Sequence, residues 1–216
     1  MLKWTPLALT FLAAVISVLV APQLPATIVS HWNWRGQPDG WAPTWMGVSV
    51  VPVTMLILIG VFHVLPRLDT LRENYRKFWP EYQRITVAIT AMLLATHLAM
   101  LANALDYHVD MIKTSVVLTG LLFAVIGNYM PRLRQNHVAG FRTAATLASE
   151  YVWTHTHRVG GSVMMATGVL MALSALAPPA WAIAIVIALV AVSTTGIFIY
   201  SGRIARRERA SLGLSR

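Results

Sequence analysis

The chain has 216 residues, of which 56% are hydrophobic and only 12% are charged, and its formal net charge is +9. Soluble domains carry about 25% charged residues, so this composition excludes an ordinary soluble domain and indicates a membrane protein. Cysteine is absent, which excludes disulfides and thiol nucleophiles, and the basic residues lie between apolar segments, which argues against nucleic-acid binding.

Six apolar segments each approach the roughly 20 residues that an α-helix needs to cross the hydrocarbon core. Backbone polar groups in lipid must be paired within their own segment, so each segment is predicted to be a helix. The predicted transmembrane helices cover residues 4–20, 45–65, 85–105, 111–130, 160–177 and 181–200. We therefore expect an all-α polytopic membrane protein that forms a single six-helix domain over residues 1–216.

An alternative interpretation of the first segment is a cleaved signal peptide, because Lys3 precedes it and Ala21 follows it. A small-x-small cleavage site is missing, however, which favours a retained helix. All but two of the 17 lysines and arginines lie at the termini and in the second and fourth loops; Arg35 and Lys113 are the exceptions. The positive-inside rule therefore places both termini and these two loops in the cytoplasm.

The first loop reads SHWNWRGQPDGWAPTW from Ser30 and is extracytoplasmic in this topology. Pro38 and Asp39 are predicted at the centre of a turn that Gly40 closes, which gives a compact, tryptophan-rich hairpin on the outer surface. The tryptophans alone are also typical of an aromatic belt, but the polar residues among them favour recognition of an outside ligand. The candidate ligand-binding residues are His31, Trp32, Asn33, Trp34, Gly36, Asp39, Gly40 and Trp41.

The second loop, residues 66–84, has Leu68, Leu71, Tyr75 and Phe78 at helical spacing, which predicts an amphipathic surface helix. This helix faces either lipid headgroups or, alternatively, a cytoplasmic protein.

The third apolar segment has a polar stripe that includes Thr86, Thr90 and His97. A histidine near mid-membrane is costly against lipid, so His97 should point into the bundle, either on a proton or ligand path or bonded to a neighbouring helix such as the one carrying Asn128. His97 and Asn103 are the candidate intramembrane polar residues.

The last two apolar segments carry small residues in register, which let transmembrane helices approach closely. Gly161, Gly168 and Ala175 repeat by sevens in the fifth segment, so we expect it to pair tightly with the sixth. The arginines of the tail are expected to bind anionic lipid.

The fourth loop, residues 127–161, is the one long polar segment between apolar runs. Pro131 should end the preceding helix, and Thr143 or Thr146 can cap a short surface helix that continues through Trp153, with Tyr151 and Trp153 at headgroup level.

Tests for chemistry in this loop are negative. His155 and His157 with Glu150 have the wrong spacing for a zinc-binding helix, so no metal is expected. No nucleophile elbow is present, so we expect no catalytic residues, no cofactor and no enzymatic activity.

Both polar loops resemble known signatures. The pattern HWN-x-x-G-x-P-D-G-W follows the first helix, and the fourth loop combines GNYMP, Arg142-Thr143, Thr146-Leu147 and Thr156-His157-Arg158. These residues resemble the Sdp-immunity (SdpI/YfhL-like) family of bacterial membrane proteins over essentially the whole chain. Two departures are Ala144-Ala145, where many members have Pro-Trp, and His155, where a basic residue is common.

The resemblance implies a multi-pass protein of the bacterial cell membrane that gives immunity to a secreted peptide toxin on the outer face. It also implies capture of a cytoplasmic transcriptional repressor, without direct contact to nucleic acid; the oligomeric state stays open. The residues that this implies for the cytoplasmic motif are Asn128, Asn136, Gly140, Arg142, Thr143, Thr146, Trp153, His157 and Arg158. The alternative function is a small transporter or channel-like protein for a peptide, lipid or proton that uses the polar face of the third helix.

Overall fold

The structure is a computed structural model and describes residues 2–213. Within these residues it has six long helices, a short helix, a two-stranded sheet and four 3-10 turns. The long helices are α1 (Thr5–Val20), α2 (Thr44–Leu68), α3 (Trp79–Ala104), α4 (Met111–Tyr129), α6 (Glu150–Ser174) and α7 (Pro179–Ser211). The other elements are β1 (Thr27–Trp32), β2 (Pro38–Pro43), α5 (Ala144–Ala148), η1 (Leu2–Trp4), η2 (Ala21–Gln23), η3 (Arg72–Lys77) and η4 (Met130–Arg132).

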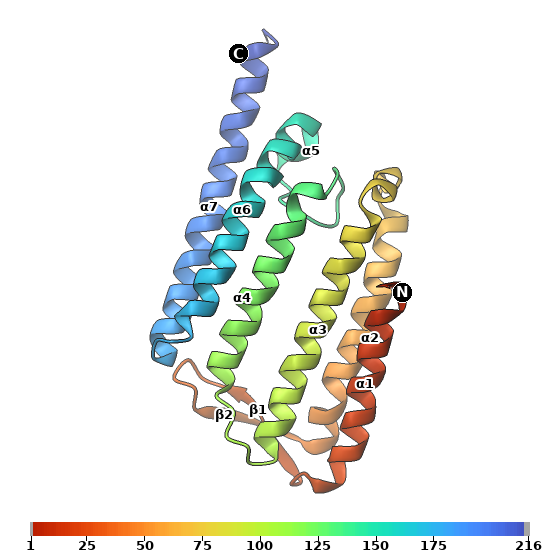
Figure 1. Cartoon of the computed structure of the whole chain (residues 1–216), viewed down its shortest axis with the longest axis vertical. Helices are drawn as coiled ribbons and strands as arrows, with labels where there is room; N and C mark the ends of the chain where they lie inside the picture. Colours follow the sequence, from red (N-terminus) through yellow and green to blue (C-terminus); the bar gives the residue numbers. More distant parts are fainter. Residues whose placement is uncertain (1, 214–216) are drawn as a thin grey trace.

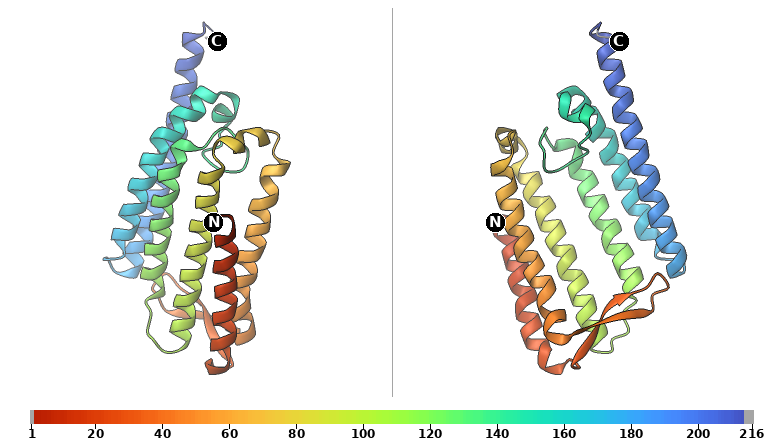
Figure 2. Two further views of the ribbon diagram at one scale, coloured as in Figure 1. Left: turned by 45° about the vertical axis from the view of Figure 1, so that its right-hand side comes forward. Right: turned by 180° about the vertical axis from the view of Figure 1, so that it is seen from behind.

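The six long helices run side by side as two groups of three. Helices α1, α2 and α3 pack together, as do α4, α6 and α7, and the groups meet along α3 and α4 (Figures 1 and 2). The β-hairpin crosses one end of the bundle, whereas η3, α5 and the loop before α5 lie at the opposite end (Figure 1). The C-terminal turns of α7 extend beyond the rest of the bundle at that second end.

The hairpin at the first end reaches from one helix group to the other. Its strands follow α1 and precede α2 in the chain, and its tip approaches the group of α4, α6 and α7 (Figure 2, right). A Cβ atom added at Gly36 would lie 3.6 Å from Ile112 of α4 and 3.8 Å from Pro179 of α7. The hairpin therefore contacts both groups of helices.

The helices have the composition that a membrane requires. Among the described residues, five helical stretches are long and apolar enough to cross a bilayer, and they contain α1, α2, α3, α4 and α7. Their outward faces expose large apolar side chains such as Leu19, Val192 and Phe198, as expected of a surface that contacts lipid. The prediction of an all-α polytopic membrane protein is confirmed.

Helix α6 differs from the other five because its first turns are polar. It is 25 residues long but carries Glu150, His157 and Arg158, and it is not among the five candidate spans. The count of six transmembrane helices and the orientation therefore stay predictions. The helix also begins at Glu150, ten residues before the predicted span, because the polar turns project past the end of its neighbour α4 (Figure 1).

The closest helix contact lies between α4 and α6. The sequence had instead predicted that the small residues of α6 would face α7. A Cβ at Gly120 would lie 2.5 Å from the Gly168 carbonyl oxygen, and one at Gly127 would lie 2.7 Å from that of Gly161. Helix α6 also packs against α7, as predicted, but its two glycines face α4. Glycines spaced by seven on both helices let the backbones touch, and this matched spacing was missed in the sequence.

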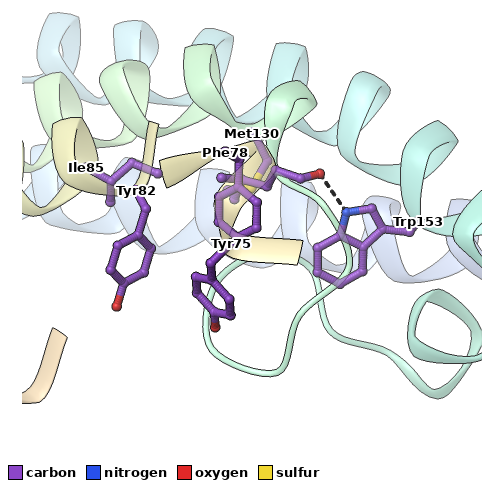
Figure 3. Close-up of a cluster of buried hydrophobic side chains, with 7 residues drawn as sticks. Tyr75, Phe78, Tyr82, Ile85, Met130 and Trp153 are labelled. Carbon is purple, nitrogen blue, oxygen red and sulfur yellow. Dashed lines mark hydrogen bonds between the residues drawn. The ribbon is translucent and has the colours of Figure 1, made fainter. Parts of the chain in front are cut away.

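The loop between α2 and α3 also differs from prediction. Helix α2 continues to Leu68, α3 begins at Trp79, and the turn η3 replaces the expected surface α-helix. Tyr75 and Phe78 are 3% and 0% exposed, so they face protein rather than lipid headgroups. They pack with Tyr82, Ile85, Met130, Leu133 and Trp153 in an aromatic-rich core that joins the two helix groups (Figure 3).

The glycine contact between α4 and α6 gives a direct test. Replacing Gly168 with alanine places a methyl group 2.4 Å from the Gly120 carbonyl oxygen, so we expect a loss of about 1–3 kcal/mol in the free energy of unfolding. Gly196→Ala on α7 is the control, because its Cβ meets no atom within 4 Å and alanine favours helix. Thermal unfolding in detergent should lower the melting temperature of the first variant only; equal melting temperatures would contradict the contact.

Candidate functional site

The segments at the α5 end of the bundle are held together by four residues that we call the inner clamp: Asp69, Tyr75, Asn136 and His137. The Asp69 side chain is fully buried just after α2. Its Oδ1 accepts hydrogen bonds from the Leu71 N–H and His137 Nδ1, both at 2.8 Å. Its Oδ2 accepts from the Tyr75 hydroxyl and the His137 N–H, also at 2.8 Å. One carboxylate thus binds the loop after α2 to the loop after α4.

Asn136 gives the second loop the shape that presents His137. Its side chain is fully buried, and Oδ1 accepts from the N–H groups of Val138 at 2.8 Å and Ala139 at 2.7 Å. Its Nδ2 donates to the carbonyls of Arg134 at 2.8 Å and Ala139 at 3.0 Å. An asparagine that bonds neighbouring backbone on both sides builds a tight turn without secondary structure.

The electrostatics of the inner clamp favour an ionised Asp69. Burial acts to raise the pKa of Asp69, but the hydrogen bonds from His137, Leu71 and Tyr75 outweigh it and hold the pKa at about 2, against an ordinary 3.8. Burial and the Asp69 carboxylate together raise the pKa of Tyr75, so the phenol remains a hydrogen-bond donor. The clamp is therefore a carboxylate whose charge is balanced by donors from both loops.

Trp153 and His157 of α6 pack against the loop that follows α4. The Trp153 side chain is 1% exposed, and its indole N–H donates to the Leu133 carbonyl at 2.8 Å (Figure 3). The His157 ring stacks on Trp153 at 3.9 Å between centroids. His157 Nε2 accepts from the Phe141 N–H at 2.9 Å, while Nδ1 lies 2.8 Å from the Trp153 carbonyl. Because Nε2 accepts, this histidine is neutral and carries its proton on Nδ1.

Gly140 and two threonines complete the loop. Gly140 has φ +119°, a conformation that favours glycine, and a Cβ there would lie 2.3 Å from His157 Nε2. Thr143 caps α5 by accepting from the Thr146 N–H at 3.1 Å, and Thr146 Oγ1 accepts from the Thr143 N–H at 2.8 Å. This confirms the predicted helix cap at Thr143.

The end of the predicted surface helix was wrong. Helix α5 stops at Ala148, and the Ser149 side chain caps a new helix by accepting from the Val152 N–H at 3.2 Å. Trp153 therefore lies in the first turn of α6 and inside the protein, not at headgroup level. Its indole fits beneath the loop, where the Leu133 carbonyl needs a donor.

The structure divides the nine motif residues into two sets. Six build the loop and its supports from within: Asn136, Gly140, Thr143, Thr146, Trp153 and His157. The other three, Asn128, Arg142 and Arg158, have exposed side chains and remain available to a partner. Arg142 also donates to the His137 carbonyl, which ties it to the inner clamp.

Sequence reasoning missed Asp69 and Tyr75 as parts of this site. Both lie in a loop whose many basic residues predict exposure to solvent. The available signal was Asp69 itself, an acidic residue directly after a predicted apolar helix.

The hairpin at the other end is confirmed, but its turn is not where the sequence predicted. Strands β1 and β2 pair antiparallel, and Pro38 to Gly40 lie inside β2. The turn is built instead by Asn33, whose Oδ1 accepts from the N–H groups of Arg35 at 2.9 Å and Gln37 at 3.1 Å, and by Gly36 at φ +80°. The asparagine side chain satisfies two backbone donors there, and the glycine adopts the left-handed conformation.

The hairpin presents aromatic and charged groups outward. Trp34 and Trp41 are 56% and 62% exposed, and the Arg35 guanidinium lies 4.5 Å from the Trp34 ring centroid. His31 Nδ1 and Asp39 Oδ1 form an exposed pair 2.5 Å apart. Of the eight predicted ligand-binding residues, these four side chains (His31, Trp34, Asp39 and Trp41) face outward most fully; Trp32 is half-buried, and Asn33, Gly36 and Gly40 shape the backbone.

The polar residues of α3 are used in internal contacts. His97 is fully buried as predicted, and its Nε2 lies 2.7 Å from Ser17 Oγ of α1, so its partner is not Asn128. Asn103 donates to the Val109 carbonyl at 3.0 Å and closes the turn before α4. Thr86 and Thr90 donate to carbonyls of their own helix. These contacts give the transport alternative no support.

No metal-binding cluster is found among residues 2–213, because no three His, Asp or Glu side chains gather there. The fold, its lipid-facing helices and its two polar ends define a multi-pass membrane protein.

The comparisons agree with the resemblance. Residues 132–201 match the SdpI/YfhL protein family, and residues 8–56 match a domain of unknown function, DUF1648. The chain is 26% identical over 179 residues to the protein named Immunity protein SdpI of Bacillus subtilis (strain 168), which covers 83% of this chain and 84% of that protein. The predicted resemblance to the SdpI/YfhL family is thus confirmed. No solved structure matches the chain.

The inner clamp predicts a pH dependence of stability. Because the pKa of Asp69 is lower in the folded protein, its contribution is fully present above about pH 4 and is lost as the pH falls through about 2. A shift from 3.8 to about 2 corresponds to about 2 kcal/mol. Asp69→Asn should therefore lower the unfolding free energy at pH 7 by about this amount and flatten its change between pH 4 and 2.

Asp106→Asn is the matched control for this experiment. Asp106 is exposed and has φ +65°, a conformation that asparagine tolerates. It should leave both the stability and its acid dependence unchanged in detergent unfolding measurements. Parallel acid curves for Asp69→Asn and the unmodified protein would refute the role of the clamp.

Proposed function

We propose that this chain is an immunity protein that protects the bacterium that makes it against a secreted toxic peptide. The observation that carries the proposal is the 26% identity to an immunity protein across 83% of this chain and 84% of that relative. We further propose that all six long helices span the membrane as one domain, with the hairpin outside and the inner clamp in the cytoplasm. The distribution of lysine and arginine supports this orientation.

The hairpin is the proposed contact for the peptide. An amphipathic peptide on the membrane surface presents an apolar face and polar groups. Trp34 and Trp41 offer exposed aromatic surface for the first, and the His31–Asp39 pair offers polar partners for the second. The pairing of β1 with β2 and the Asn33 turn fix these side chains before binding, which lowers the entropy cost of association.

The same hairpin is the proposed origin of a signal. It contacts both helix groups at one end of the bundle, while the inner clamp joins the same groups at the other. Binding that shifts one group against the other would strain the clamp. Arg142, which donates to the His137 carbonyl, would then change its position together with the clamp. A cytoplasmic repressor that reads Arg142 and Arg158 is the proposed partner.

Survival under toxin tests the proposal. A toxin-sensitive bacterium is made to express this chain. It is then challenged with the toxin that the Bacillus subtilis relative of this chain counters, and with peptides secreted by the bacterium from which this chain comes. Trp34→Ala should abolish protection, because it removes exposed aromatic surface from the hairpin, and Arg142→Ala should do so by removing a cytoplasmic anchor. The measurement is the number of surviving cells at equal amounts of protein in the membrane.

Two matched substitutions serve as controls. Trp45 is 69% exposed but lies on α2 outside the hairpin, and Arg206 is exposed on α7, outside the loops that form the inner clamp. Trp45→Ala and Arg206→Ala should retain protection. Full survival of cells with both Trp34→Ala and Arg142→Ala would reject these site assignments, and a lack of protection by the unmodified chain against every peptide would reject the immunity function.

A further inference from the structure

A cavity of about 560 Å³ lies between α1, α2 and α3 at the end of the bundle that carries the inner clamp. The cavity exists because α1 begins partway along the bundle. The chain starts α1 at Thr5, whereas α2 and α3 continue past that level (Figures 1 and 2). The beginning of α1 therefore leaves a slot between its two neighbours. Leu7, Leu56 and Ile59 line this slot, together with aromatic side chains.

Polar end groups lie at the rim of this apolar slot. Lys3, His63 and Gln83 line it, and within residues 2–213 their side chains have no hydrogen-bond or ion-pair partner. The Lys3 ammonium lies 5.3 Å from the centroid of the Trp4 ring, which also lines the slot. A cavity with an apolar body, and with a lysine and polar side chains at its rim, suits a ligand with an apolar tail and an anionic head.

A second hollow of about 440 Å³ adjoins the first and shares His63 and Trp79 with it. Its other lining residues include three arginines, Arg67, Arg72 and Arg76. The one acidic residue in its lining, Glu73, lies 3.5 Å from Arg76, and both of these side chains are well exposed. The hollow therefore has a strong excess of positive charge directly beside the apolar slot.

We propose that the two hollows together bind one anionic phospholipid of the leaflet on the clamp side of the membrane. An acyl chain fills the slot between α1, α2 and α3. The phosphate lies near His63, between Lys3 on one side and Arg67 and Arg72 on the other. Basic pockets between transmembrane helices on the cytoplasmic side are a recognised means of binding anionic headgroups. The site is separate from the hairpin and does not rest on the proposed immunity function.

The slot favours a lipid over a soluble anion. A free phosphate needs only the arginines and would leave about 560 Å³ of apolar cavity unused. A zwitterionic lipid fills the slot equally well but gains less from the arginines, because its headgroup carries no net charge. Selectivity for a negative headgroup, combined with dependence on the apolar slot, is therefore the property that identifies this site.

Gly60 permits a steric test of the acyl-chain site. It lines the slot, and a Cβ there would meet no atom within 4 Å, so Gly60→Leu should fill the slot without disturbing the fold. The matched control is Gly196→Leu on α7, which is equally open but far from the slot. For the headgroup, the double variant Arg67→Gln/Arg72→Gln is compared with Arg206→Gln/Arg207→Gln on α7.

The measurement is native mass spectrometry of the full chain in detergent, titrated with phosphatidylglycerol, phosphatidylcholine or glycerol 3-phosphate. The unmodified protein should retain phosphatidylglycerol about tenfold more than phosphatidylcholine, as expected for a net contribution from several charges. Gly60→Leu and the Arg67/Arg72 variant should lose this preference, and both α7 controls should keep it. Glycerol 3-phosphate should not be retained.

Three outcomes would overturn the proposal. Equal retention of both phospholipids would show ordinary boundary lipid. Retention of glycerol 3-phosphate as strong as that of phosphatidylglycerol would show a simple anion site. An unchanged preference in the Arg67/Arg72 variant would place the headgroup elsewhere, and this result stands even if Gly60→Leu fails to fold.

Discussion

The buried carboxylate of Asp69 is the interaction on which the clamp end of this molecule depends. A charge removed from water is tolerated only if donors surround it, and here the donors come from two loops that are far apart in sequence. The groups α1–α3 and α4–α6–α7 touch along α3 and α4 and through the hairpin, and Asp69 adds a polar bond at the opposite end. The aromatic core around Tyr75 and Trp153 then packs beneath that bond.

The polar motif between α4 and α6 serves largely to hold its own loop together. A dense run of polar residues between apolar helices suggests a surface that binds a partner. Most of those side chains instead bond to backbone within the loop, as Asn136 and His157 do. These bonds restrain the loop, because Asn136 and His157 have partners that only one conformation of the backbone provides. The exposed Arg142 is tied to this loop through its bond to the His137 carbonyl, so its position depends on the inner clamp.

The sequence predicted the helices well and the polar contacts poorly, for one physical reason. Lipid forces every spanning segment to satisfy its own backbone, so hydropathy alone locates α1, α2, α3, α4 and α7. The hairpin turn depends instead on which side chain reaches the backbone, and Asn33 supplies the turn rather than Pro38 and Asp39. Likewise, the spacing of the glycines on α4 determines which residue Gly168 contacts. The Leu133 carbonyl, twenty residues earlier in the chain, accepts the hydrogen bond that keeps Trp153 buried.

In the proposed topology, the tryptophan hairpin and the inner clamp lie on opposite sides of one membrane. The chain has no cysteine, so a single introduced cysteine reports its own position. Gln37 on the hairpin and Arg134 beside the clamp are both exposed and suit this purpose. In intact cells, a membrane-impermeant maleimide should label Gln37→Cys at once and Arg134→Cys only after permeabilisation. Labelling of Arg134→Cys in intact cells, with Gln37→Cys protected, would contradict the account.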